Sequence, residues 1–223
     1  SVGGVDAIGA NDQRSTVNRL DYANDDTTLI PRGPLTTGIA YQSSASNRNY
    51  GYSMGGGNSP YKSHVERIDF GNDTATATPK GPLSVTSIWI AAGTGNQNYG
   101  YAGGGYPGKT HIDRIDYSND TPTALAKGYL TAGRRYLGAT GNANFGYWMG
   151  GRADPPAAYV STVDRLDYSS DTTNAVAKGP LSVVKARVGG LGNSNYAWIA
   201  GGSPGPLSQV DRIDFSNDTA TAL

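Results

Sequence analysis

The sequence contains no cysteine and few residues of several other chemically useful types. Of its 223 residues, two are histidine and three are phenylalanine, and 18 acidic side chains balance 18 basic ones. The missing cysteine excludes disulfides, thiolate nucleophiles and zinc–thiolate sites. Zero net charge argues against nucleic acid and anionic membrane surfaces as partners, because both call for a basic face. No run approaches the ~18 apolar residues of a membrane-spanning helix, so we expect no membrane insertion.

Glycine and tyrosine are abundant instead, with 32 and 15 residues, and they recur in a repeated pattern. One phrase, of the type Thr-Val-Asp-Arg-Leu-Asp-Tyr, occurs five times at steps of about 47 residues. Its copies begin near Ser15, Ser63, Thr110, Ser161 and Ser208. A Lys-Gly-Pro-Leu type of phrase and an Asn-x-Asn-Tyr phrase leading to Gly-Gly accompany it in constant order. This self-similarity indicates a repeat architecture in one domain spanning 1–223.

Each unit has the pattern of four short strands and no helical periodicity. Residues alternate in Val65–Phe70, and further strands are expected over Thr74–Thr78, over Val85–Ala91 and in the Tyr-rich phrase. Four antiparallel strands per ~47 residues make one propeller blade. The sequence therefore predicts an all-β, five-bladed β-propeller of four-stranded antiparallel blades. The first blade should lack most of its inner strand, because few residues precede Ser15, and Val5–Ile8 is predicted to be its second strand. We expect a single chain to close the ring; a longer natural array is the alternative.

The unit resembles the kelch repeat, in which a strand ending in Gly-Gly is followed by a strand with an aromatic residue. The Gly-Gly pairs stand at 55–56, 103–104, 150–151 and 201–202. Kelch units usually carry a Trp in the outer strand, and none stands there here. The amino-acid sequence of the repeat is also similar to that of repetitive propeller proteins encoded by marine bacteriophages and bacteria. The resemblance implies a propeller and, by analogy, an extracellular or virion-associated location. The galactose oxidases share the kelch-like propeller, but their copper site uses a tyrosine–cysteine crosslink that this sequence cannot form.

Two sets of charged residues repeat in step. An Arg and an Asp two residues apart share one strand face, where we expect a structural ladder between blades, with a polar binding wall as the alternative. The members are Arg19, Asp21, Arg67, Asp69, Arg114, Asp116, Arg165, Asp167, Arg212 and Asp214. The second set is interpreted as turn residues, since the sequence has no dense Asp-rich calcium loop. It comprises Asp25, Asp73, Asp120, Asp171 and Asp218. His64 and His111 are expected to be packed or solvated strand-start residues, so we predict no metal site.

Carboxylates that repeat in step favour scaffolding over catalysis, which needs unlike groups to converge in one place. We therefore predict no catalytic residue and no cofactor. Positions that vary among the repeats are the candidate ligand contacts, since variation on a constant scaffold can carry specificity. These candidates are Tyr41, Trp89, Tyr136, Arg187, Tyr61, Tyr106 and Tyr159. The alternative role for the aromatics is to fill wedge-shaped space between blades.

These features favour a non-enzymatic recognition module, most simply a multivalent carbohydrate-binding or cell-surface-binding propeller of the phage-fibre or adhesin type. Aromatic faces with polar neighbours suit sugar rings, and repeated weak sites gain avidity on a repetitive surface. The alternative is a structural or protein–protein interaction propeller, with no small-molecule ligand and a partner site on the variable-loop face that includes residues 152–160. We expect a monomer or a part of a longer chain.

Overall fold

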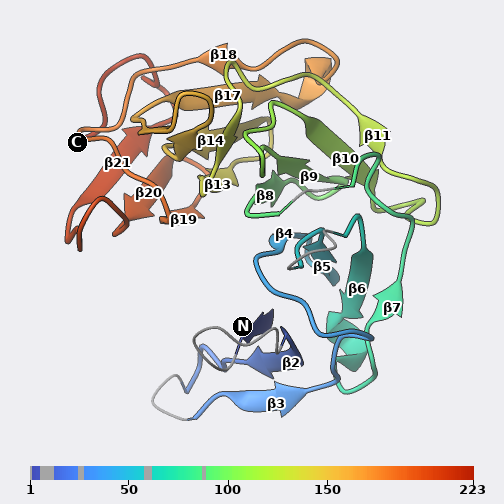
Figure 1. Ribbon diagram of the computed structural model, residues 1–223. Coiled ribbons are helices and arrows are strands. Elements are labelled where there is room, and N and C mark those ends of the chain that lie inside the picture. The colour runs from blue at the N-terminus through green and yellow to red at the C-terminus, as the bar shows by residue number, and fades with distance from the viewer. Residues whose placement is uncertain (1, 6–12, 25–27, 58–61, 87–88) are drawn as a thin grey trace.

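The computed structural model describes residues 2–5, 13–24, 28–57, 62–86 and 89–223 (Figure 1). Strands pair antiparallel in every sheet of this part of the chain. Each copy of the repeat phrase forms a strand that contains its arginine, and each copy lies in a sheet of its own. These five strands are β2 (Gln13–Arg19), β6 (Val65–Asp69), β10 (Ile112–Asp116), β17 (Val163–Asp167) and β21 (Val210–Asp214).

The remaining strands complete five main sheets. Their orders are β1-β2-β3, β4-β5-β6-β7, β8-β9-β10-β11, β13-β14-β17-β18 and β19-β20-β21. The added strands are β1 (Val2–Val5), β3 (Ile30–Arg32), β4 (Ser43–Ser46), β5 (Tyr50–Met54), β7 (Thr78–Pro79), β8 (Ala92–Gly95), β9 (Tyr99–Gly103), β11 (Leu125–Ala126), β13 (Gly138–Gly141), β14 (Phe145–Met149), β18 (Val176–Ala177), β19 (Gly189–Gly192) and β20 (Tyr196–Ala200). Two 3₁₀ turns, η1 (Phe70–Asn72) and η2 (Tyr168–Ser170), follow β6 and β17.

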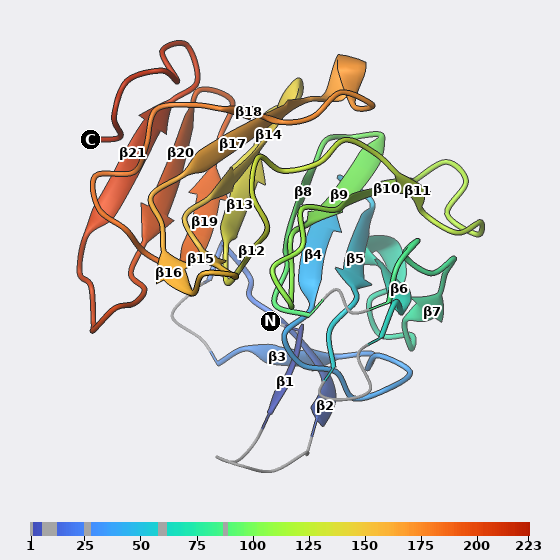
Figure 2. The same ribbon diagram turned by 45° about the horizontal axis from the view of Figure 1, so that its top comes forward.

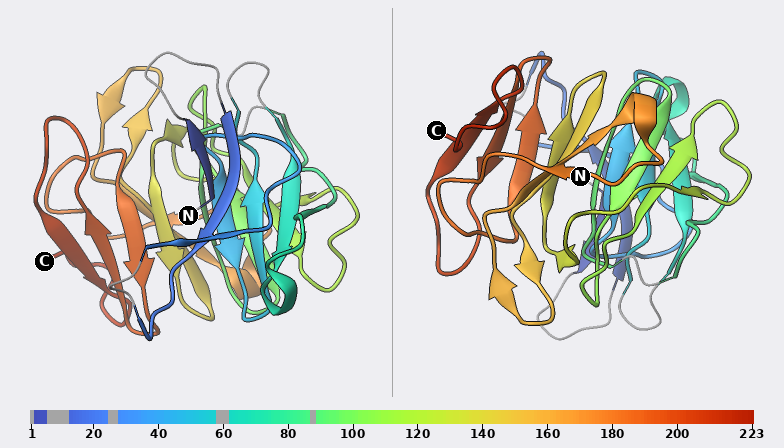
Figure 3. Two further views of the ribbon diagram at one scale, coloured as in Figure 1. Left: turned by 90° about the horizontal axis from the view of Figure 1, so that it is seen from below. Right: turned by 90° about the horizontal axis from the view of Figure 1, so that it is seen from above.

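The sheets follow one another in chain order around an arc (Figures 1 and 2). Strands β4, β8, β13 and β19 contact one another in succession along its inner side. Seen at right angles to Figure 1, the sheets pack face to face as successive layers (Figure 3). A small extra sheet joins β12 (Arg134–Arg135), which precedes β13, to β15 (Arg152–Ala153) and β16 (Ala158–Tyr159), which lie in the long segment after one Gly-Gly pair (Figure 2). The arrangement is a propeller-like all-β fold.

The inner strand of the third sheet lies further along the chain than predicted. The prediction placed it over Val85–Ala91, whereas β8 covers Ala92–Gly95. The backbone of Ile90 has a φ of 61°, which interrupts an extended chain. Gly93 then lets β8 approach β4 closely, because a Cβ at Gly93 would lie 2.2 Å from the backbone oxygen of Ser44. Gly93 and Gly95 are therefore both part of the strand.

Two other strand ranges also need correction. Within the segment Thr74–Thr78 only Thr78 belongs to a strand, and Thr78–Pro79 pairs with β6. In the first sheet the paired strand is Val2–Val5, while residues 6–8 of the predicted range lie outside the described part. Val2 pairs with Val17 as Met54 pairs with Val65. By this register, residues 3–4 are equivalent to the other Gly-Gly pairs and form a fifth one. Alignment of the repeats did not identify this pair, because a longer segment separates it from the phrase.

A repeated ionic contact, called here the junction ladder, joins each sheet to the next. The arginine of one phrase strand bonds the turn aspartate of the following sheet at 2.8–2.9 Å. The pairs are Arg19–Asp73, Arg67–Asp120, Arg114–Asp171 and Arg165–Asp218. A second cation and a tyrosine hydroxyl complete most of these contacts. At Asp171, one oxygen accepts from Tyr101 Oη (2.9 Å) and Arg114 Nη1 (2.8 Å), and the other lies 3.2 Å from Lys127 Nζ.

Four of the five arginines predicted for the ladder join neighbouring sheets in the described part of the chain, but with other aspartates than those predicted. The aspartate two residues after each phrase arginine instead accepts a backbone N–H two residues further on. These acceptors are Asp21, Asp69, Asp116, Asp167 and Asp214. Hydrogen bonds from Ser118, Ser169 and Ser216, respectively, lower the pKa of the last three carboxyls. The aspartates interpreted as turn residues are the bridging groups, apart from Asp25, which lies outside the described residues. Arg212, in the last sheet, packs over the Tyr196 ring at 4.9 Å.

Stacked aromatic rings lie beside the ladder at three junctions. An aromatic residue of the second strand in one sheet stacks on the aromatic residue that follows the phrase in the next sheet. The pairs are Tyr52–Tyr117, Tyr101–Tyr168 and Tyr147–Phe215, with centroids 4.6–4.7 Å apart. Tyr101 and Tyr147 are fully buried. Rings of this size contribute a large share of the apolar area buried between sheets.

One of these stacked rings has a hydroxyl without a hydrogen-bond partner among the described residues. This is the buried Tyr117 Oη, whereas Tyr168 Oη lies 3.3 Å from Thr94 Oγ1 at the next junction. Ala45 stands opposite Tyr52 just as Thr94 stands opposite Tyr101. Introducing Ala45→Thr should therefore raise the free energy of unfolding by about 1 kcal/mol, the usual value of a hydrogen bond to a buried polar group. Urea denaturation measures the change.

Two controls separate the hydrogen bond from added volume. Ala45→Val adds the same number of heavy atoms without a hydroxyl and should not reproduce the gain. In the Tyr117→Phe background, Ala45→Thr should give no stabilisation. A gain that persists in that background would refute the assigned partner.

Candidate functional site

Four residues from successive repeats share a left-handed backbone conformation. Tyr41, Ile90, Tyr136 and Arg187 have φ angles of 59°, 61°, 59° and 58°, and each stands two residues before an inner strand. Each backbone N–H donates to the preceding member: Ile90 to Tyr41 O (3.0 Å), Tyr136 to Ile90 O (3.0 Å) and Arg187 to Tyr136 O (2.8 Å). These four residues, called here the left-handed row, run across four sheets.

The row keeps side chains where glycine would be more stable. A φ near +60° costs a residue with a Cβ roughly 1–2 kcal/mol. Every other residue with positive φ in the described part is a glycine, in a sequence that holds 32 of them. Ile90 is buried, and its packing offsets the backbone strain. Tyr41, by contrast, is 46% exposed, and Arg187 is exposed as well. Strain retained at exposed side chains makes these positions candidates for a functional site.

Aromatic rings extend from the first member of the row. The Tyr41 and Trp89 rings meet edge to face at 5.4 Å, and Trp89 meets Tyr106 in the same way at 5.4 Å. A backbone hydrogen bond from Tyr106 N–H to Trp89 O (2.9 Å) fixes the segment after Gly-Gly against this cluster. The variable loop and the row therefore form one surface.

Two guanidinium groups lie over tyrosine rings of this surface. Arg187 packs over the Tyr136 ring at 4.7 Å, and Arg135 lies 4.8 Å from the Tyr106 centroid. Arg135 also forms an ion pair with Asp154 at 3.0 Å, which holds it in place. Such stacking orients the donor groups of arginine while leaving its edge able to bond a ligand.

A cavity of about 480 Å³ opens beside the row, within the size range of small-molecule sites. Its walls are formed by all four row members together with three neighbours. The lining residues are Tyr41, Gln42, Ile90, Ala91, Tyr136, Leu137 and Arg187. Aromatic, aliphatic and cationic groups from four repeats thus face one space.

The structure gathers five of the seven sequence-predicted contacts here: Tyr41, Trp89, Tyr106, Tyr136 and Arg187. Tyr159 lies in β16, beside β15, and lines neither this cavity nor the larger one described below. Tyr61 lies outside the described residues. Ile90 is the row member that the sequence did not identify. The third repeat is one residue longer before its inner strand, so alignment from the Lys-Gly-Pro-Leu phrase places Trp89 at the equivalent position.

Buried carboxylates beside the row were not identified from the sequence. The residue after the first Val or Ile of the phrase strand is acidic and buried in four sheets, and each of these carboxylates lies beside a basic side chain. The pairs are Glu66–His64, Asp113–His111, Asp164–Arg134 and Asp211–Lys185. Both histidines thus pair with carboxylates at strand starts. Where a histidine is absent, Arg134 or Lys185 supplies the charge from the segment before the inner strand.

The carboxylates also share a second partner. A hydroxyl residue after the Leu of the link phrase donates to each one, as Thr131 Oγ1 does to Asp164 (2.6 Å) and Ser84 Oγ to Asp113 (2.6 Å). Burial lowers the pKa of the Arg134 guanidinium, and Asp164 opposes that shift. Each carboxylate thus has a basic neighbour and a hydroxyl donor, so we interpret these groups as supports for the row rather than as reactive groups. No cluster of three or more metal-binding side chains occurs among the residues that the structure places.

Comparison with known proteins gives the fold and nothing finer. No protein family model and no curated protein match this sequence. Chains of known structure do match, among them one described as "Structure of YjhT", with a TM-score of 0.79 and 12% identity. The alignment covers 100% of this chain and 80% of that one. Together with the antiparallel sheets, this likeness supports a propeller-like all-β fold. Over the same described residues, no helix is long and apolar enough to span a membrane.

Proposed function

We propose that this chain is a non-enzymatic recognition module that binds carbohydrate at the left-handed row. The observation that carries the proposal is the retention of exposed Tyr41 and Arg187 at φ angles that favour glycine. Rings at Tyr41, Trp89 and Tyr136 offer flat apolar faces to sugar C–H groups. The guanidinium of Arg187 and the amide of Gln42 offer polar contacts to hydroxyls around the cavity.

The number of blades and the setting belong to the same proposal. Five units would make a five-bladed propeller of the kelch-like kind if the first sheet met the last. Such closure would cover Tyr22 and Val210, which are 90% and 55% exposed. An extracellular or virion-associated location, as in a phage fibre or an adhesin, would present the site to surface glycans.

Glycine substitutions in the row test the proposal because they separate binding from folding. Tyr41→Gly and Arg187→Gly should leave stability unchanged or raise it by up to about 1 kcal/mol, since the left-handed strain is relieved. The same variants should lose about tenfold or more in affinity for the best glycan found on an array. Calorimetry and thermal unfolding measure the two quantities.

Tyr129→Ala provides the matched control, since it removes a tyrosine that is about as exposed as Tyr41 (48%) and lines neither cavity. It should leave glycan affinity unchanged. The proposal fails if the array shows no glycan bound, or if both row variants bind as well as the unaltered chain.

A further inference from the structure

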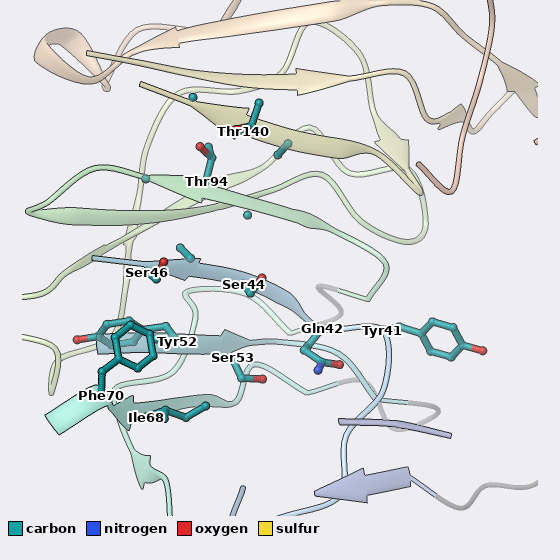
Figure 4. A pocket seen from close by; sticks show the side chains of 16 residues that line it. Tyr41, Gln42, Ser44, Ser46, Tyr52, Ser53, Ile68, Phe70, Thr94 and Thr140 are labelled. Carbon is teal, nitrogen blue, oxygen red and sulfur yellow. The ribbon is translucent and has the colours of Figure 1, made fainter. Parts of the chain in front are cut away.

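A second, larger cavity continues from the row along the inner strands. Its volume is about 750 Å³, and it shares Tyr41 and Gln42 with the cavity beside the row. Figure 4 shows Ser44 and Ser46 on β4 along its wall, with Tyr41 at one end of this series and pointing away from it. The two cavities therefore meet at the first member of the row.

The larger cavity has an uncharged, hydroxyl-rich lining. Thr94 on β8 and Thr140 on β13 face it together with Ser44 and Ser46 (Figure 4). The other lining residues are Tyr41, Gln42, Ala45, Gly51, Tyr52, Ser53, Ile68, Phe70, Gly93, Gly95, Ala139 and Gly141. Not one of these residues is ionisable near neutral pH. A charged group would lose its hydration here without gaining a counter-ion, whereas hydroxyl groups would find matching donors and acceptors.

We infer that each chain binds a single uncharged, polyhydroxylated polymer, whose end contacts the left-handed row and whose length lies along the hydroxyl-lined inner strands. This inference rests on the proposed carbohydrate binding and names its ligand class and stoichiometry. Because Tyr41, Ile90, Tyr136 and Arg187 border one common cavity, one ligand touches several repeats at once. The repeats therefore build one composite site, which differs from the multivalent binding suggested by the repeat pattern.

Calorimetry with ladders of neutral oligosaccharides tests the inference. Gluco-, manno- and N-acetylglucosamine oligomers of increasing length should bind with about one ligand per chain and gain about tenfold or more in affinity with length. Affinity should change little between low and high salt, because the larger cavity holds no charge to screen. A stoichiometry near the number of repeats, affinity independent of length, or a steep fall with salt would each overturn it.

A charge placed in the larger cavity tests the location. Ser44 is exposed on the inner strand, so Ser44→Lys should fold while cancelling the gain with length and leaving the shortest bound ligand unaffected. Thr123→Lys, at an exposed position outside the strands, is the control for added charge and should keep the full gain. Failure of the proposed function would look different: the Tyr41→Gly variant would then bind every length as well as the unaltered chain. If Ser44→Lys keeps the gain with length, the ligand does not follow the inner strands.

Discussion

Replacing Arg134 with methionine should lower the free energy of unfolding by about 3–5 kcal/mol, because Asp164 would then be a buried carboxylate without a cation. Both side chains are fully buried. Arg134 Nη1 also donates to the backbone oxygens of Gly150 (2.6 Å) and Thr162 (3.0 Å). Loss of Arg134 therefore removes a hydrogen-bond donor from three acceptors, these two oxygens and the Asp164 carboxylate. Urea denaturation of the two proteins measures the difference.

The other repeats indicate how this loss can be repaired. In the second sheet, Ile39 holds the place of Arg134, and His64 Nε2 provides a hydrogen-bonding partner for the buried Glu66 instead. In the third sheet, His111 does the same for Asp113, at 3.0 Å. Introducing a histidine at Thr162, which aligns with His64 and His111, should therefore compensate for an apolar residue at 134.

The double variant Arg134→Ile with Thr162→His should regain at least half of the lost stability, while Arg134→Ile alone should be as damaging as the methionine variant. Arg48→Met, at an exposed position, is the control for losing an arginine and should change stability by less than about 0.5 kcal/mol. If the double variant is no more stable than Arg134→Ile, then charge compensation is not what links these positions.

The repeated features of the fold could be predicted from the sequence because the residue patterns that indicate them occur in several repeats. Alternation around Arg67 and its equivalents predicts the phrase strand, and recurring Gly-Gly pairs predict where the preceding strand ends. Which aspartate bonds each arginine could not be predicted in this way. In the repeat pattern, Asp69 and Asp120 are both candidate partners for Arg67. Only the packing of one sheet on the next shows that Arg67 pairs with Asp120.

The candidate site could be predicted in part for the same reason. Variation at Tyr41, Tyr136 and Arg187 stands out against a constant background, so these residues were identified. Ile90 was missed because a one-residue difference in length shifts the alignment, and backbone conformation is not visible in residue identity. The buried pairs were missed because their cation moves between two positions, so no single column of the repeat shows it. Only the fold brings Arg134 and His64 to equivalent roles.

Replacing Asp171 with asparagine should be the next most damaging change, with a loss of about 2–4 kcal/mol. Its carboxylate is 7% exposed and receives Tyr101 Oη, Arg114 Nη1 and Lys127 Nζ within 3.2 Å. Asparagine keeps the shape but leaves two cations without a counter-charge and offers a donor where an acceptor is needed. The loss should be only partly relieved by salt, because the junction is largely buried.

Asp167→Asn is the matched comparison, four residues earlier in the same unit. Asp167 accepts the N–H and hydroxyl of Ser169 at an exposed turn, so its replacement should cost no more than about 1 kcal/mol. The repeat pattern alone assigned the inter-sheet role to Asp167 and the turn role to Asp171, which predicts the opposite order. Urea denaturation of the two variants therefore decides between the two assignments: a larger loss at Asp167 would contradict the junction ladder, whereas a larger loss at Asp171 means that the sheets are held together through the residue that looked like a turn.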